Sequence, residues 1–497
     1  MASPGRICDP CFASKALLTV LPRAIWNIQR QLHPLVCTSL QTNRKMPAST
    51  EYLGHYFLNL TKQARRHLLG ILEHTARQHT RHWSSYETLG AVLPGRLVVL
   101  AQCQPSVSAA GADNRVAPKV VVVSMWRPEA QVWHTRFNES ELGNLAAWST
   151  AVSGLSMLYP RVFCTETRNI CQLTLGEGEI NAAASMMALV LSTQFDFRKS
   201  YFLFAGIAGV NPHYATVGSV AIARYAVQVA LQYEIDPRSL PQDWPTGYIS
   251  YGRDYPLQYP SVVYGTEVFE VNENLRQAAF LLASNSSLKD QKGPQEYRSK
   301  YSGGGYRDTM ATKAPSVVKC DIATSDVYYS GTKLAVAFEN TTTLWTNGSG
   351  IYCMSAQEEN ATLEVMVRAA IEGLVDFARI ILVRAGSNFD RPPPGLSDWE
   401  HLRRTDQNGF MIAVENLYNV GIGIVRGIVS DWNCTYQRGI EPSNYIGDIF
   451  GSLGEEPDFG FGSITEGKKV TAGGYNLGLA TVEMERRKGF GLRATLK

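Results

Sequence analysis

Residues 204–219 read FAGIAGVNPHYATVGS, and this stretch decides the fold. The apolar run 201–204 predicts a buried strand, and Ala205-Gly206-Ile207-Ala208-Gly209 follows it directly. In an open α/β sheet, ligands bind beyond the carboxyl ends of the strands, and residues with little side chain let backbone N–H groups approach them. Tight packing explains a single turn of this kind more simply. The stretch therefore predicts a ligand site only together with a second element.

A second glycine-rich turn lies upstream. Residues 175–184 read LGEGEINAAA and open a predicted helix over 181–193. Such a turn can present free N–H groups and the positive end of a helix to an anion or to the polar edge of a sugar. The two turns in this order, with a helix and a strand between them, favour one shared cup at the rim of a sheet.

The rest of the chain alternates strands and helices. The β-branched run 119–123 is typical of a strand covered on both faces. Further strands are predicted over 200–204, 219–223, 333–338 and 379–384, and helices over 181–193, 362–377 and 408–432. This alternation predicts an α/β domain with a mainly parallel sheet, spanning 116–497 and carrying a long insertion or lid at about 235–318. Residues 1–115 are predicted to form a basic, poorly patterned N-terminal extension and linker.

Composition excludes some partners. The 497 residues carry 47 Lys and Arg against 44 Asp and Glu, so the net charge of +3 does not indicate nucleic-acid binding. We find no uninterrupted apolar span of about 20 residues and therefore expect no transmembrane helix. The nine cysteines lack the spacing of a zinc site, which predicts no metal centre, and they leave one disulfide as plausible as none.

The compartment is predicted from two opposed features. Seven Asn-x-Ser/Thr sequons favour a secreted glycoprotein or one of the secretory pathway; they start at Asn59, Asn138, Asn285, Asn340, Asn347, Asn360 and Asn433. The apolar run 16–21 is short for a secretory signal and is followed by Pro22-Arg23. A cytoplasmic location is therefore the alternative.

The glycine turns, followed by VGSV (217–220), resemble the nucleoside phosphorylase and nucleosidase superfamily. The fuller resemblance is to the fungal purine nucleoside permease family, over roughly 116–450. It rests on PKVVVVSMWRPEAQVW (118–133), ATSDVYYSG (323–331), QEENATL (357–363) and VRAGSNFDRPPPG (383–395) in this order. The resemblance implies a nucleoside-phosphorylase-like fold, with a mixed or parallel sheet flanked by helices, and a small-molecule ligand.

The resemblance also implies three catalytic carboxylates. Glu358 stands where superfamily members hold the ribose hydroxyls with a glutamate, and a helix-capping acid is its alternative. Glu129 falls in the loop after the first strand, near the attacking water or anion, although a solvated loop acid is as plausible. Asp390 is the candidate acid near the base, provided that the chain bends to aim it.

The remaining candidates bind substrate. The glycine turns would contact the anion or the sugar edge, the 323–331 segment would stack the base, and the last strand would reach the purine N7 or hold phosphate. These residues are Gly176, Gly178, Ala208, Gly209, Asp326, Tyr328, Arg384, Ser387 and Asn388. Of the three histidines after residue 115, we expect His134 to be structural and His401 to be exposed, whereas His213 could face the ligand.

Two departures from the superfamily pattern leave the activity open. Asn388 can donate a hydrogen bond to a purine N7 but cannot act as a general acid, and Ser330 stands where relatives tend to carry a histidine. The leading hypothesis is a nucleoside-binding or nucleoside-cleaving protein, leaning towards an enzyme without a cofactor and with phosphate as a possible co-substrate. Binding in support of uptake is included in it. The alternative is a phosphorylase-like pocket repurposed for a cyclisation or rearrangement in fungal secondary metabolism. A homo-oligomer is possible by analogy.

Overall fold

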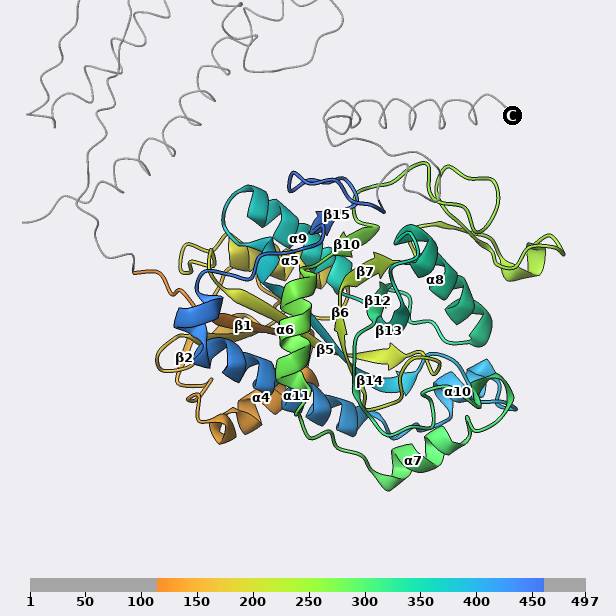
Figure 1. The fold of residues 1–497 in the computed structure, drawn as a ribbon, viewed down its shortest axis with the longest axis horizontal. Coiled ribbons are helices and arrows are strands. Elements are labelled where there is room, and N and C mark those ends of the chain that lie inside the picture. Colours follow the sequence, from red (N-terminus) through yellow and green to blue (C-terminus); the bar gives the residue numbers. More distant parts are fainter. Residues whose placement is uncertain (1–113, 460–497) are drawn as a thin grey trace, which may run out of the picture. The chain divides into compact units, whose positions relative to one another are not determined.

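A computed structural model describes residues 114–459 of the chain (Figure 1). Thirteen strands in this part form one mixed sheet, and β8 and β9 form a separate two-stranded sheet. The strands are β1 (Val120–Ser124), β2 (Trp148–Ala151), β3 (Arg161–Cys164), β4 (Ile170–Thr174), β5 (Tyr201–Val210), β6 (Val220–Ala223), β7 (Tyr225–Gln228), β8 (Tyr233–Glu234), β9 (Tyr248–Ile249), β10 (Val268–Glu270), β11 (Val317–Val318), β12 (Asp321–Thr324), β13 (Tyr352–Ala356), β14 (Ile380–Phe389) and β15 (Gly447–Asp448). The helices are α4 (Arg127–Arg136), α5 (Glu179–Val190), α6 (Glu273–Ala283), α7 (Lys292–Ser299), α8 (Thr332–Trp345), α9 (Glu359–Ile371), α10 (Asp398–Arg403) and α11 (Phe410–Ser430).

Strand β5 is the centre of the sheet. It pairs in parallel with β1 on one side and with β14 on the other, and its last residues also pair antiparallel with β13. Strand β4 continues the parallel part beyond β1, and β3 and β2 close that edge in antiparallel fashion. The carboxyl ends of β1, β5 and β14 therefore meet at one rim.

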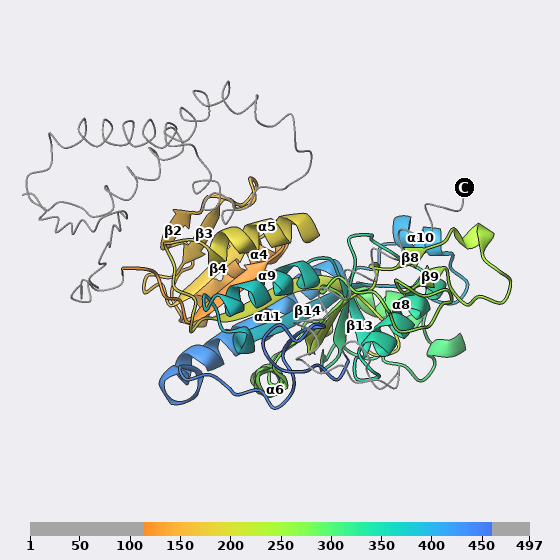
Figure 2. The same ribbon diagram turned by 90° about the horizontal axis from the view of Figure 1, so that it is seen from above.

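Helices cover both faces of this sheet (Figures 1 and 2). Because side chains alternate across a strand, Val121 of β1 joins one core with Met186 of α5 and Leu363 of α9. Val122 joins the opposite core with Leu417 of α11. Burial on both faces explains why β1 is a continuous apolar run, and the α/β class with a mixed sheet flanked by helices is confirmed.

Two expected elements differ from the structure. The small-residue stretch 205–209 continues β5 rather than forming a loop after it. The expected strand at 333–338 is wrong, because these residues belong to helix α8. Its buried residues Ala335, Phe338, Thr342 and Trp345 recur at helical spacing, a pattern hidden by the short apolar run KLAVAF.

The expected insertion at 235–318 contributes in part to the main body. Strand β10 pairs with β7 in the main sheet, and α6 packs on the core shared with α11 through Leu275 and Ala279. The N-terminal extension, apart from residues 114 and 115, lies outside the described residues.

Helix α11 is long and apolar enough to cross a membrane by length and composition, and it is the only such helix among residues 114–459. Most of its apolar window is buried inside the protein, against β5 and β14. The same pattern is typical of the core helix of a globular domain.

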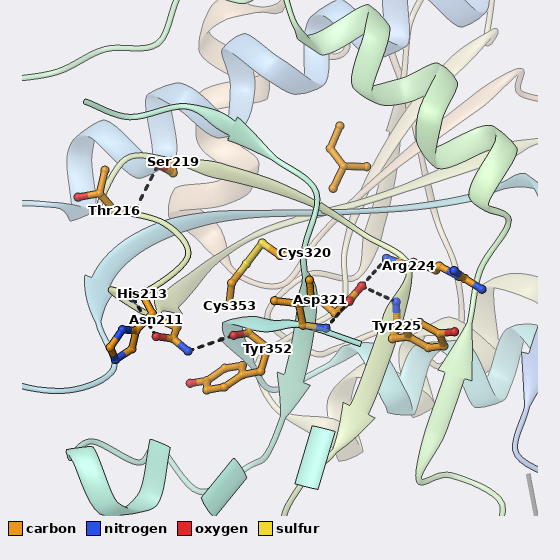
Figure 3. The surroundings of a disulfide bond; sticks show 12 residues. Asn211, His213, Thr216, Ser219, Arg224, Tyr225, Cys320, Asp321, Tyr352 and Cys353 are labelled. Atoms are coloured by element: carbon orange, nitrogen blue, oxygen red, sulfur yellow. Dashed lines mark hydrogen bonds between the residues drawn. A yellow bond between two sulfur atoms is a disulfide. The ribbon is translucent and has the colours of Figure 1, made fainter. Parts of the chain in front are cut away.

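Two buried disulfides are present in the described part. Cys164–Cys171 joins β3 to β4, and Cys320–Cys353 joins the start of β12 to β13. Beside the second bridge, Asp321 Oδ1 accepts the backbone N–H groups of Arg224 and Tyr225, each at 2.9 Å (Figure 3). The cysteine spacing alone left even one disulfide undecided.

Candidate ligand site

A cavity of about 350 Å³ lies at the rim where β1, β5 and β14 end. Its lining residues come from all three strand ends, from the segment after β12 and from the connection between α10 and α11; they are Trp126, Ile207, Tyr328, Ser330, Ser387, Asn388, Phe389, His401, Leu402, Thr405, Asp406, Gln407, Asn408, Gly409 and Phe410. The rings of Trp126 and Phe410 lie 5.8 Å apart, centroid to centroid. Together with Tyr328 they provide aromatic surface on which a planar ligand can stack.

Arg384 of β14 organises the polar region next to this cavity. Its guanidinium is buried and pairs with Glu359 through Nε and with Glu358 Oε2 through Nη2 at 2.9 Å. Its Nη1 donates to the backbone oxygen of the cavity residue Ile207 at 2.8 Å. Burial alone would lower the pKa of Arg384, but the two carboxylates hold it above its usual value. The guanidinium of Arg384 thus bonds two carboxylates and the backbone of β5.

Glu129, in the first turn of helix α4, completes this network at Ile207 of β5. Its Oε1 accepts the Ile207 N–H at 2.7 Å, and its Oε2 accepts the Met125 N–H at 2.8 Å. Burial raises its pKa to about 7, and the nearby charge of Arg384 opposes that rise. The side chain is therefore buried and tied to the rim, and it is not the solvated loop acid that the sequence left open.

The glycines of β5 make room for the network. A Cβ on Gly206 would lie 2.5 Å from Arg384 Nη1 and 3.0 Å from Glu129 Oε1. A Cβ on Gly209 would lie 2.4 Å from the hydroxyl of Ser355. The small residues in AGIAG therefore let two charged side chains cross the strand, in addition to any contact with a ligand.

The turn before α5 lies against the same acids. Gly178, at a φ of 84°, donates its N–H to Glu358 Oε1 at 3.1 Å, and the Glu179 N–H donates to Asp326 Oδ1 at 2.9 Å. The Gly176 N–H donates to the backbone oxygen of Met125. The N–H groups of Gly176, Gly178 and Glu179 are therefore not free, because carboxylates and a carbonyl of the chain itself accept them.

Glu358 does not cap its own helix. It stands at the N-cap position of α9, yet its side chain accepts no hydrogen bond from the first turn of that helix. Its two oxygens instead join the α5 turn to β14. Each carboxylate oxygen retains acceptor capacity, so the group can still receive hydroxyl donors from a ligand.

Asn388 and Ser387 lie in the cavity wall. The Ser387 hydroxyl contacts Ala208 O at 3.1 Å and Asn388 Oδ1 at 2.8 Å. Asn388 Nδ2 donates one hydrogen to Phe389 O at 3.3 Å and carries a second one. Nearby, the Ser330 hydroxyl also lines the cavity and is buried without a hydrogen-bond partner among the described residues.

Asp390 is not brought to the other candidates. Its carboxylate accepts Arg391 Nε at 2.8 Å and Nη2 at 3.0 Å, and it accepts the Tyr352 hydroxyl at 2.7 Å. Asp390 is ion-paired with its neighbour Arg391 and is not among the cavity residues, so it is not placed to act as the acid at position 388. Glu358, Glu129, Arg384 and Asp326 are not among the cavity residues either; Glu129 and Arg384 contact the cavity residue Ile207. His213 is also absent from the cavity wall; its ring packs on Tyr306.

His401 corrects another expectation, because it is buried rather than exposed. Its Nδ1 lies 2.6 Å from the Tyr297 hydroxyl, and its Nε2 lies 3.0 Å from Phe389 O. Gln407 accepts the Phe389 N–H at 2.7 Å, so the two side chains hold the backbone directly after Asn388. Burial lowers the pKa of His401, which keeps the ring neutral at pH 7.

Sequence reasoning missed other residues as well. Glu359 and Glu179 belong to the acidic network, and burial together with the charges of Asp326 and Glu358 raises the pKa of Glu179 to about 7. In the sequence, Glu359 and Glu179 were marked only by lying next to Glu358 and Gly178. No group of three or more His, Cys, Asp or Glu side chains within 114–459 is arranged to hold a metal ion.

Residues 117–441 match the sequence profile of the purine nucleoside permease family, and the chain belongs to this family. A purine nucleoside permease of Candida albicans is 46% identical over 349 residues, which are 69% of this chain and 83% of that protein. A probable purine nucleoside permease of Schizosaccharomyces pombe is 36% identical over 324 residues, 64% of this chain and 90% of that protein.

Solved structures with a similar arrangement are nucleosidases. A 5′-methylthioadenosine/S-adenosylhomocysteine nucleosidase from Neisseria meningitidis matches with a TM-score of 0.38 and 14% identity, over 63% of this chain and 99% of that one. A futalosine hydrolase from Helicobacter pylori matches with a TM-score of 0.35 and 14% identity, over 63% of this chain and 98% of that one. At these values the likeness says nothing about what this chain binds.

Proposed function

We propose that this chain binds purine nucleosides in the cavity at the ends of β1, β5 and β14, and that it holds them with little cleavage of the N-glycosidic bond. The family assignment supports a nucleoside-related role and does not favour the alternative of a pocket repurposed for secondary metabolism. The observation that carries the proposal is that Ile207, which lines the aromatic cavity, also accepts a hydrogen bond from Arg384, the partner of Glu358.

In this proposal the base lies between the aromatic side chains, with Tyr328 against one face. Asn388, whose side chain contacts both Phe389 O and the Tyr328 side chain, would turn one Nδ2 hydrogen to an acceptor on the base, for which N7 of a purine has the required chemistry. The ribose hydroxyls donate to Glu358, whose position is set by Gly178 and Arg384.

Slow turnover follows from the protonation chemistry of the cavity wall. Release of a purine requires a proton at the base, and an amide at 388 cannot deliver it near neutral pH. His401 is neutral and engaged through both ring nitrogens, and the carboxylate of Asp406 accepts the Asn408 N–H. The site is therefore suited to capturing a nucleoside in support of uptake, the role that the name of the Candida relative indicates for that relative.

Titration calorimetry with adenosine, guanosine and inosine, in parallel with detection of free base, tests this proposal. Binding with a Kd in the micromolar range and release of less than one base per protein over an hour is the expected result. 7-Deazaadenosine should bind about tenfold more weakly, because it lacks the acceptor for Asn388. Absence of binding of every purine nucleoside would refute the proposal, and rapid base release would refute its second half.

We also propose that the protein folds in an oxidising compartment of the secretory pathway. Two buried disulfides support this, because such bonds form in oxidising environments and are rare in the cytosol. The exposed sequon residues Asn138 and Asn285 agree with it.

A further inference from the structure

We infer that the polar end of the proposed site selects uncharged nucleosides and rejects phosphate, both as a 5′-phosphate group on the ligand and as a free co-substrate. This inference rests on the proposed function and concerns the charge of its substrate. It is drawn from the hydrogen bonds of the rim and from the balance of charge around Arg384.

Three backbone donors that could bind an anion are already in use. Phosphate sites in α/β proteins are built from free N–H groups at a glycine turn and a helix N-terminus. Here the Gly178 N–H is taken by Glu358, the Glu179 N–H by Asp326, and the Ile207 N–H by Glu129. An incoming phosphate would have to displace a carboxylate of the chain from each of them.

The cation that could bind an anion is used as well. Arginine holds phosphate through its guanidinium fork, but the fork of Arg384 faces Glu358 and Glu359, and its remaining nitrogen donates to Ile207 O. The guanidinium is only 2% exposed, so no donor surface remains for a solute.

The excess of acidic groups over basic groups around Arg384 disfavours the binding of an anionic ligand. Three carboxyl groups surround this guanidinium, those of Glu359, Glu358 and Glu129. Two more, of Glu179 and Asp326, lie at the α5 turn that Glu358 also contacts. Mutual repulsion is already evident, because the charges of Asp326 and Glu358 add to the effect of burial in raising the pKa of Glu179. A dianionic phosphate would enter a region that the protein itself keeps short of positive charge.

The same arrangement accepts a neutral sugar. Ribose hydroxyls are donors, and the carboxylates of Glu358 and Asp326 retain lone pairs that can accept them. Glu179, which is only half-buried, has an oxygen, Oε1, without a hydrogen-bond partner among the described residues. The polar end is therefore an acceptor-rich surface that matches donors and repels anions.

The experiment compares adenosine with adenosine 5′-monophosphate in titrations of the full-length protein at pH 8, above the pKa of about 7 of Glu129 and Glu179. We expect the nucleotide to bind at least about 100-fold more weakly at low salt. 5′-O-Acetyladenosine, a neutral ligand of comparable bulk, should bind within about fivefold of adenosine. Raising the salt from 0.01 M to 1 M shortens the Debye length from about 30 Å to about 3 Å. This should reduce the difference in affinity between adenosine and the nucleotide, and leave that between adenosine and the acetyl ester unchanged.

Matched variants identify the charges responsible. Glu179→Gln and Asp326→Asn each remove one charge and should each reduce the discrimination against the nucleotide by about tenfold. Glu372→Gln removes the same charge at the opposite end of α9, about 20 Å from Glu358. This variant should leave the discrimination against the nucleotide unchanged.

The outcomes separate this inference from the proposed function. Equal binding of nucleoside and nucleotide overturns the inference and leaves the proposed function standing. If the acetyl ester loses as much affinity as the nucleotide, bulk rather than charge is responsible, and the inference is overturned in the same way. Inorganic phosphate alone, at millimolar concentration, should not raise the melting temperature. If adenosine fails to bind, the proposed function is refuted. In that case, a rise in melting temperature with phosphate would overturn the inference too, whereas an unchanged melting temperature would uphold the exclusion of anions.

Discussion

Replacing Gly206 by alanine tests the central arrangement of the site without reference to any ligand. The new Cβ would lie 2.5 Å from Arg384 Nη1 and 2.9 Å from its Cζ. Contact at normal van der Waals distance requires the guanidinium to retreat by about 1 Å. Because the guanidinium is held by Ile207 O, Glu358 and Glu359, this retreat must weaken at least one charge-assisted hydrogen bond.

The cost combines two terms. A weakened charge-assisted bond removes about 1.5–3 kcal/mol, and overpacking of a filled core site adds about 1–3 kcal/mol. We therefore expect the free energy of unfolding to fall by about 3–5 kcal/mol, which corresponds to a loss of roughly 4–7 °C in melting temperature for a domain of this size. Nucleoside affinity should fall as well, because Glu358 loses its partner.

Scanning calorimetry of the full-length protein measures the change, and Gly303→Ala is the matched control. Gly303 has no atom within 4 Å of its ideal Cβ and no positive φ, so alanine there should be neutral or slightly stabilising. If Gly206→Ala melts within about 1 °C of Gly303→Ala, the guanidinium does not cross β5 at this glycine and the account of the polar network is wrong.

Three further predictions follow from the same structure. Asn388→Asp places an acid in the cavity wall, and we expect base release from adenosine to rise by about 100-fold, with affinity kept within a few-fold; unchanged release would show that the proton is not the missing element. Glu129 has a pKa of about 7 in the folded protein against 4.5 for the ordinary side chain, so the folded state binds its proton more tightly and stability falls as the pH rises between these values. This contributes up to about 3 kcal/mol, and Glu129→Gln should therefore reduce the drop in melting temperature between about pH 5 and pH 8; an equal drop in the variant would contradict the burial of this acid. In protein from a eukaryotic secretory host, mass spectrometry should find N-glycans on the exposed Asn138 or Asn285 and none on Asn360, which is buried and donates to Thr266 O; unmodified Asn138 and Asn285 would count against the proposed compartment.

Much of the fold could be predicted because its signals are local. The β-branched run of β1 and the helical spacing in α5, α9 and α11 each depend on neighbouring residues in the chain. Helix α8 was mistaken for a strand where a short apolar run fits both periods, and the buried residues beyond the run, such as Thr342 and Trp345, distinguish them.

The site was harder to predict because its decisive contacts join distant segments. The burial of His401 depends on Tyr297, 104 residues earlier in the chain, and the pairing of Cys320 with Cys353 depends on the register of two strands. The occupied N–H groups of the α5 turn depend on Glu358 and Asp326, which lie 180 and 147 residues away from Gly178 and Glu179 respectively. A glycine turn looks the same in sequence whether a ligand or a side chain accepts its donors.

The buried pairing of Arg384 with Glu358 and Glu359 limits how this protein can change over generations. Loss of the arginine alone would strand two acids away from water, at a cost of about 3–5 kcal/mol, whereas loss of one acid leaves the arginine matched by the other. Descendants of this sequence should therefore lose an acid before they lose the arginine. A lineage that gave up Arg384 first would have to tolerate a partly unfolded ancestor on the way.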